Sequence, residues 1–91
     1  MRLTLQPGDD IVAMVRGTDT ESVVVVVPPL ADGLATALAR AAIGPLAIEC
    51  APHRRLNAVF VHENASATNV DAAIVFLEQA RSTTGQILDL A

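Results

Sequence analysis

The stretch TALARAAIGPLAIECAPHRRLNAVF, residues 36–60, decides the fold. Its first half is rich in apolar residues and predicts a long helix that begins at Asp32 or Gly33. The residues spaced three and four apart along this helix are Leu34, Leu38, Ala41, Ala42, Pro45, Leu46 and Glu49. A turn at 52–54 follows, and Arg55–His62, with LNAVFV at its centre, is typical of a buried strand.

The dipeptide Gly44-Pro45 leaves two readings of this helix open. A proline inside a helix loses one hydrogen bond and clashes with the carbonyl four residues back, at a cost of roughly 3 kcal/mol. In the first reading the helix ends at Gly44, and residues 46–51 form a strand. In the second reading one kinked helix runs on to Cys50. The pattern of residue types by itself favours the first.

Two strands are predicted before the helix. Val23–Val27 is a run of valines with no polar alternation, which indicates a strand buried on both faces, and Pro28-Pro29 ends it. Residues 1–6 alternate between apolar and polar types, which is typical of a half-buried strand. We expect residues 1–6 to lie beside Val23–Val27 and to cover an edge that would otherwise favour aggregation.

The remaining segments complete a regular alternation of strands and helices. Residues 10–16 predict a short helix, residues 68–81 a second amphipathic helix, and residues 86–90 a last strand. The resulting order β-α-β-α-β-α-β predicts an α/β fold with a parallel sheet. The chain of 91 residues is expected to form one domain, 1–91.

Composition narrows the class of protein. The net charge is −4, the six basic residues are all arginines without a basic stripe, and Trp and Tyr are absent, which argues against a nucleic-acid partner. The longest apolar run, Val23 to Ala31, is far shorter than a membrane span, and MRLTLQPGDD is no signal peptide. With a single cysteine, Cys50, these features predict a soluble, cytoplasmic protein without a membrane segment. The hydrophobic share of 52% exceeds what a small monomer easily buries and suggests a subunit interface.

Three motifs then occur in a characteristic order: Glu49-Cys50-Ala51-Pro52, Arg55-Leu56-Asn57-Ala58-Val59 and Thr84-Gly85-Gln86. They resemble the E-L-A-P, R-V-N-A-V and T-G-Q of the C-terminal half of a short-chain dehydrogenase/reductase, over roughly residues 11–91. The resemblance implies a three-layer or half Rossmann-like fold, with a small parallel sheet of three to four strands and two long helices. It implies a single truncated domain, and it favours a helix that continues through Gly44-Pro45.

The same resemblance implies an NAD(P)-dependent oxidoreductase, but the residues at the chemical positions differ. The catalytic Y-x-x-x-K corresponds to Thr36 and Arg40, and Pro28 stands near the family serine. A threonine hydroxyl cannot act as the phenolic acid, and an arginine stays protonated. The glycine-rich dinucleotide turn has no counterpart, since Pro7-Gly8 lacks that pattern. The expectation is a degenerate member, a pseudoenzyme with no catalytic residues, no cofactor-binding residues and no bound cofactor.

A polar loop offers the remaining candidate site. His62, Glu63 and Asn64 follow the predicted strand 55–62, at the end of a parallel strand where ligands of open α/β sheets bind. A solvated loop is the simpler interpretation, and it is the one we favour. Two scattered histidines do not suggest a metal site. Arg40 is interpreted as a surface arginine that lies over apolar neighbours.

The expected function is therefore that of a non-catalytic short-chain dehydrogenase/reductase-like protein that acts through assembly. It would form a homo-oligomer, most simply a homodimer, or serve as an accessory subunit of a full-length reductase. The alternative is a residual NAD(P)-dependent oxidoreductase or a small-ligand binder. The expected interface is the last helix and strand, with Leu88, and the long helix 33–50 is the other candidate.

Overall fold

The computed structural model describes residues 1–30 and 32–91. Four parallel strands form one sheet in the order β1-β2-β3-β4. The strands are β1 (Arg2–Thr4), β2 (Ser22–Val27), β3 (Arg55–Val61) and β4 (Ile87–Leu90). The helices are α1 (Ile11–Arg16), α2 (Gly33–Cys50) and α3 (Ala67–Gln79). The predicted alternation of strands and helices is confirmed.

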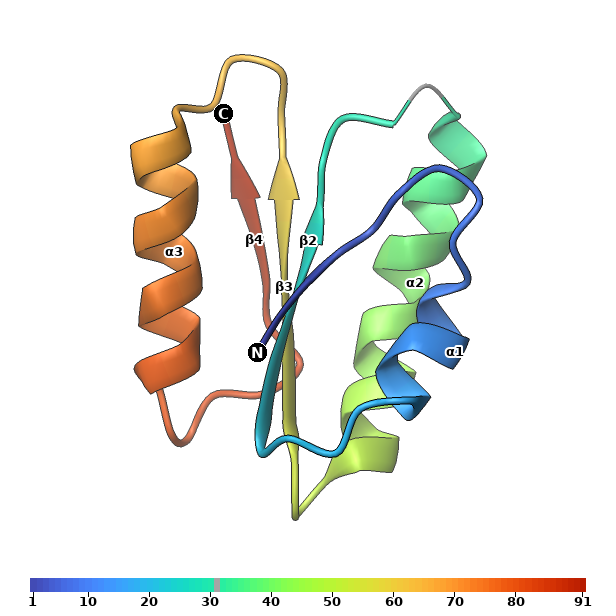
Figure 1. The fold of residues 1–91 in the computed structure, drawn as a ribbon, viewed down its shortest axis with the longest axis vertical. Coiled ribbons are helices and arrows are strands. Elements are labelled where there is room, and N and C mark those ends of the chain that lie inside the picture. Colours follow the sequence, from blue (N-terminus) through green and yellow to red (C-terminus); the bar gives the residue numbers. More distant parts are fainter. Residues whose placement is uncertain (31) are drawn as a thin grey trace.

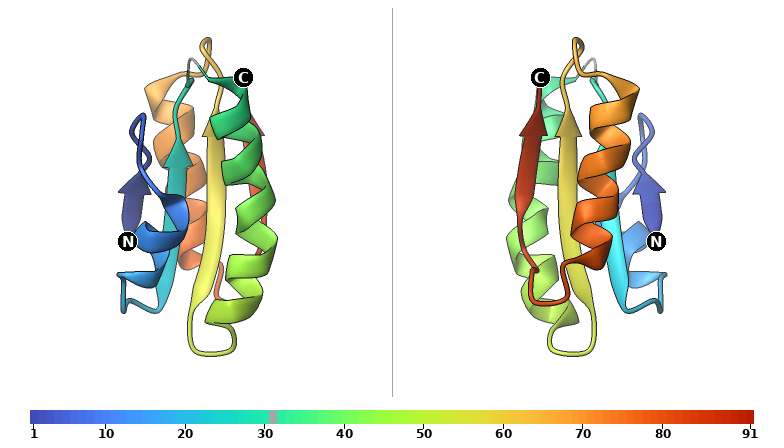
Figure 2. Two further views of the ribbon diagram at one scale, coloured as in Figure 1. Left: turned by 90° about the vertical axis from the view of Figure 1, so that its right-hand side faces the viewer. Right: turned by 90° about the vertical axis from the view of Figure 1, so that its left-hand side faces the viewer.

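The helices cover the sheet from both sides, so that the protein has three layers. Figure 1 shows α1 and α2 against one face of the sheet and α3 against the other. The strands lie side by side between these two layers (Figure 2). Each helix starts at a side chain that accepts backbone N–H groups: Asp10 before α1, Asp32 before α2 and Ser66 before α3. The α/β class with a small parallel sheet and two long helices is thus confirmed.

The central strands are buried on both faces, as the valine run predicts. Val23, Val25 and Val27 belong to the core under α1 and α2. Val24 and Val26 belong to a second core under α3, together with Ile74 and Leu77. The two-residue period of a strand therefore supplies apolar side chains to both layers.

Helix α2 continues without a break through Gly44-Pro45 and ends at Cys50. The reading in which one helix runs on to Cys50 is confirmed. The nitrogen of Pro45 carries no hydrogen and cannot donate to the carbonyl of Ala41. Both residues are exposed, so this carbonyl lies toward the solvent side of the helix. Leu46 and Ala47 are buried directly after the proline and hold the second half of the helix against the sheet.

The first residues of the chain cover the edge of β2, as predicted. Strand β1 is parallel to β2, with Leu3 opposite Val25. The backbone N–H of Leu5 donates to the carbonyl of Val26 at 2.8 Å, and the Leu5 side chain is buried. Residues 1–5 therefore leave little of the apolar β2 strand open on that side.

Candidate functional site

Four residues that the sequence analysis singled out line one pocket at the carboxyl ends of β2 and β3: Thr36, Arg40, His62 and Glu63. A pocket of about 190 Å³ there is lined by Thr36 and Arg40 of α2, by His62 and Glu63, and by the segment from Val27 to Leu30. The parallel strands bring these segments to one edge of the sheet. Asn64 is exposed and is not among the residues that line this pocket.

Arg40 is held by two groups. Its guanidinium carbon lies 4.4 Å from the centre of the Phe60 ring, a cation–π contact. Its Nη1 and Nη2 atoms donate to the two carboxylate oxygens of Asp89, at 3.1 Å and 2.5 Å. Phe60 and Asp89 are register partners on β3 and β4, which explains why one side chain reaches both. The interpretation of Arg40 as an arginine over an apolar neighbour is correct, with an ion pair added to it.

The side chains of Arg40 and Asp89 shift each other's pKa. The hydrogen bond from Arg40 holds the pKa of Asp89 below its ordinary value. The imidazole Nε2 of His62 lies 3.4 Å from the Oδ1 atom of Asp89 and lowers the pKa of that carboxyl further. The same carboxylate raises the pKa of Arg40, mainly through the hydrogen bond.

Thr36 faces the same pocket but its hydroxyl is engaged within its own helix. The Oγ1 atom lies 3.4 Å from the carbonyl oxygen of Asp32, to which it donates. An aliphatic hydroxyl has no tendency to ionise near neutral pH, and a guanidinium releases no proton there. Thr36 and Arg40 can therefore bind an acceptor or an anion, but they cannot pass a proton to a reacting carbonyl.

His62 and Glu63 form the outer part of the site. Both are exposed, and the carbonyl of His62 accepts the backbone N–H of Ala65 in a turn. Within residues 1–30 and 32–91, no group of three or more His, Cys, Asp or Glu side chains converges as a metal site would need.

Sequence reasoning missed Phe60 and Asp89. Both were counted as parts of strands, and nothing along the sequence joins Asp89 to Arg40, which is 49 residues away. The available signal was a single acidic residue between Leu88 and Leu90 near the carboxyl end of the last strand. A charged side chain at that place lies close to the residues that follow the neighbouring parallel strand.

The family model for short chain dehydrogenase-like proteins (SDR-like) matches residues 7–90. Searches of curated proteins and of solved structures gave no significant match. The matched range includes six of the seven elements, from α1 to β4, and both Thr36 and Arg40. The chain belongs to the short-chain dehydrogenase-like family.

Proposed function

We propose that this protein is a non-catalytic member of its family that acts through assembly, with a second copy of itself bound to the outer face of α2. One observation carries the proposal: the exposed side of this long helix is apolar from end to end. Leu34, Leu38 and Ile48 are 65%, 61% and 78% exposed.

The outer face of α2 is defined by seven exposed apolar or small residues. They are Leu34, Ala37, Leu38, Ala41, Gly44, Pro45 and Ile48. Exposed charges on α2 occur only at Arg40 and Glu49, and each is paired within the chain, with Asp89 and Arg16 respectively. A continuous apolar surface without free charge is typical of the core of a subunit interface.

A second copy fits this face because the face is the same on both chains. A two-fold contact places like elements together, and an uncharged face does not repel its own copy. By length and composition alone α2 could also cross a membrane, but a sheet-covering helix passes that test too. Ile43 of the same helix is fully buried against the sheet, which favours a helix that stays packed in the domain.

The absence of catalysis is supported by the site. The residues at the family's Tyr and Lys positions are Thr36 and Arg40; the hydroxyl of Thr36 donates to the carbonyl of Asp32, and Arg40 pairs with Asp89. Pro28 lines the same pocket near the place of the family serine and offers no hydroxyl. We expect no turnover of reduced nicotinamide with ketones or 3-oxoacyl thioesters.

Light scattering of the purified protein at micromolar concentration tests the assembly. We expect the mass of a dimer, and we expect Ile48→Glu and Leu38→Glu to give monomers, because each would place two like charges in a buried contact. Val75→Glu, on the exposed side of α3, is the matched control and should remain dimeric. A folded wild-type monomer, or a dimer unaffected by both α2 substitutions, would refute the proposed interface. A full-length reductase as partner would then be the remaining form of the assembly hypothesis.

A second candidate, binding of a small ligand or of NAD(P) at the strand-end pocket, is favoured by one observation. Thr36, Arg40 and His62 line one pocket of about 190 Å³. A ligand that binds the folded state must raise its stability. An increase of the melting temperature with NADH or NADPH that disappears in Arg40→Met would support this candidate over the first.

A further inference from the structure

Two side chains of the strand-end pocket converge on one carboxylate oxygen. The Nη2 atom of Arg40 donates to the Oδ1 atom of Asp89 at 2.5 Å, and the Nε2 atom of His62 lies 3.4 Å from the same oxygen. The Nη1 atom of Arg40 donates to the other oxygen, Oδ2, at 3.1 Å. Arg40 belongs to α2 and His62 follows β3, so two separate elements hold a single carboxylate. Two parallel N–H groups on the two oxygens are the usual way in which an arginine recognises a carboxylate.

The two groups that hold this carboxylate line the pocket, whereas the carboxylate itself does not. Arg40 and His62 are among the lining residues, and Asp89 reaches them from β4, the edge strand of the sheet. The side chains of Arg40 and Asp89 are 42% and 45% exposed, so solutes can reach this ion pair. An exposed ion pair gains little free energy over its solvated ions, and another carboxylate can therefore replace that of Asp89.

The remaining walls of the pocket suit a short apolar body. The apolar residues that line it are Val27, Pro28, Pro29, Leu30, Phe60 and Val61. Thr36 and Glu63 also line it, and the Glu63 side chain is exposed. The volume of about 190 Å³ is smaller than the roughly 300–1,000 Å³ of a drug-sized site, so the pocket admits a ligand of only a few carbon atoms.

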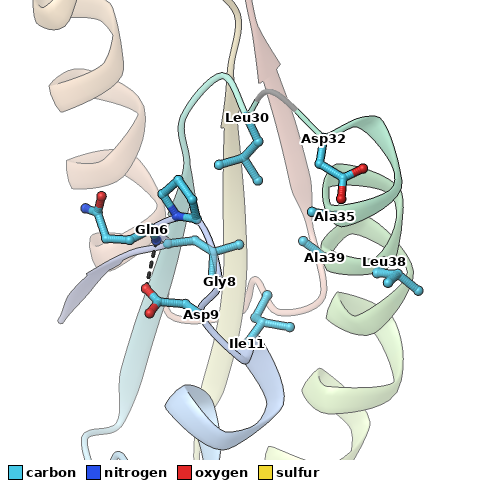
Figure 3. A pocket seen from close by; sticks show the side chains of 11 residues that line it. Gln6, Gly8, Asp9, Ile11, Leu30, Asp32, Ala35, Leu38 and Ala39 are labelled. Carbon is cyan, nitrogen blue, oxygen red and sulfur yellow. Dashed lines mark hydrogen bonds between the residues drawn. The ribbon is translucent and has the colours of Figure 1, made fainter.

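A second pocket beside α2, of about 470 Å³, has the opposite charge (Figure 3). It is lined by other residues of α2 and shares Leu30 with the strand-end pocket. Asp9 and Asp32 line it, and no arginine or histidine does so in the part of the chain that the structure describes. An anion is repelled by these carboxylates and attracted by Arg40, so a carboxylate ligand should prefer the strand-end pocket.

We propose that the strand-end pocket binds a small monocarboxylate with a short alkyl body, and that this carboxylate takes the place of Asp89 on Arg40 and His62. The proposal rests on the second candidate function, ligand binding at this pocket, and names the chemical class of the ligand. The alkyl body lies against the apolar walls, where it gains free energy by leaving water. The pocket and the outer face of α2 have no described residue in common, so ligand binding and assembly use separate surfaces.

Two probes of equal shape test the class of ligand: 3-methylbutanoate and its amide, 3-methylbutanamide. Each is titrated into the purified protein near neutral pH and followed by the backbone amide resonances of residues 60–64 and 87–90. We expect the acid to bind about threefold more tightly than the amide, as a partly exposed ion pair allows. The resonances of residues 5–11, beside the pocket in Figure 3, should not shift with the acid.

Two substitutions test the exchange with Asp89. Asp89→Asn keeps an oxygen acceptor for Arg40 but removes the competing negative charge. We expect it to raise the affinity for the acid about fivefold, the effect of one like charge at about 4 Å in water, and to leave the affinity for the amide unchanged. Arg40→Met keeps an unbranched apolar stem beside Phe60 and should lower the affinity for the acid to that for the amide. The matched control, Asp19→Asn, removes the same charge from the exposed loop before β2 and should change neither affinity.

The proposal is overturned if the acid binds no more tightly than the amide to the wild type, if Asp89→Asn leaves the affinity for the acid unchanged, or if folded Arg40→Met keeps the preference. A shift of residues 5–11 by the acid in place of residues 60–64 would also overturn it. Equal binding of acid and amide at residues 60–64 would refute the class of ligand and keep the pocket as a ligand site. No shift with either probe at millimolar concentration would refute both, and the mass from light scattering tests the dimer separately.

Discussion

Arg40 donates two hydrogen bonds to Asp89, at 3.1 Å and 2.5 Å, and thereby ties α2 to the last strand of the sheet. Thr36-x-x-x-Arg40 resembles the family's Y-x-x-x-K pattern, in which Arg40 corresponds to the lysine. A guanidinium between a carboxylate and the Phe60 ring is a structural contact between layers. The positive charge of Arg40 thus has its partner, Asp89, within the same chain.

The first prediction concerns the pH dependence of this ion pair. The folded-state pKa of Asp89 lies below its usual value of 3.8, so the pair stabilises the fold fully above that pH. The stabilisation is lost as the pH falls through the folded-state pKa. Asp89→Asn should therefore be less stable than the wild type at about pH 7, and the difference should shrink as the pH falls below 3.8. Urea unfolding midpoints at about pH 7 and at an acid pH below 3.8 measure this.

The control for this comparison is Asp19→Asn, which changes an exposed aspartate outside any ion pair among the described residues. Its midpoint should follow the wild type at both pH values. If Asp89→Asn behaves like this control, the ion pair contributes nothing to stability in solution, as happens for many exposed pairs.

The second prediction concerns Asn57, which is fully buried in β3. Its Nδ2 atom donates to the carbonyl of Thr83, and its Oδ1 atom accepts the N–H of Gln86, both at 3.0 Å. Asn57→Ala leaves both backbone groups without this partner and should cost about 2–3 kcal/mol of unfolding free energy. Asn69→Ala, an exposed position of α3, should stay within about 0.5 kcal/mol of the wild type. Similar stability of the two variants would show that the 83–86 loop is held in another way.

The third prediction concerns Gly85, which has a φ of +75° in the turn before β4. Its N–H donates to the carbonyl of Leu56 at 2.7 Å, and a Cβ atom there would lie 3.5 Å from the Cβ of Ala47. Gly85→Ala should destabilise the protein by about 1–2 kcal/mol, chiefly through the left-handed backbone. Gly33→Ala places its Cβ in open space at the start of α2 and should be neutral or slightly stabilising. Thermal unfolding of both variants compares them directly.

The sequence predicted the order of elements well because the strands have a clear apolar signal. The unbroken valine run of β2 is typical of a strand buried on both faces, and the alternation at 1–6 is typical of a strand buried on one face. The contacts of Arg40 could not be predicted in the same way, because they depend on the register between β3 and β4.

The orientation of α2 was also beyond the sequence. Most of the residues that the sequence pattern spaces three and four apart are exposed, and of that set only Leu46 is buried. The buried residues of α2 are Ala39, Ile43, Leu46 and Ala47. A helix that is apolar all round has no period from which the core side can be chosen. The side of α2 that faces away from the sheet is also apolar. It is the surface that we propose binds a second copy of the protein.

The fourth prediction concerns the edge covered by the first residues. Without residues 1–6, the β2 carbonyls of Ser22 and Val26 and the N–H of Val24 lose their partners, and an apolar strand edge is exposed. Such an edge pairs with other chains, so the shortened protein should aggregate. The control is Arg2→Ala with Thr4→Ala, which keeps the strand and changes only exposed side chains. A shortened protein that is as soluble and stable as this control would contradict the assigned role of β1.

The most direct test of the central claim, assembly through the outer face of α2, is cross-linking by a single cysteine. Ala41 lies at the middle of this face, where a two-fold contact brings a residue near its own copy. In a Cys50→Ser background, Ala41→Cys should form a disulfide-linked dimer under mild oxidation, and Val75→Cys on α3 should not. Equal cross-linking of both variants, or none at Ala41→Cys in a protein that is folded at micromolar concentration, would contradict the account.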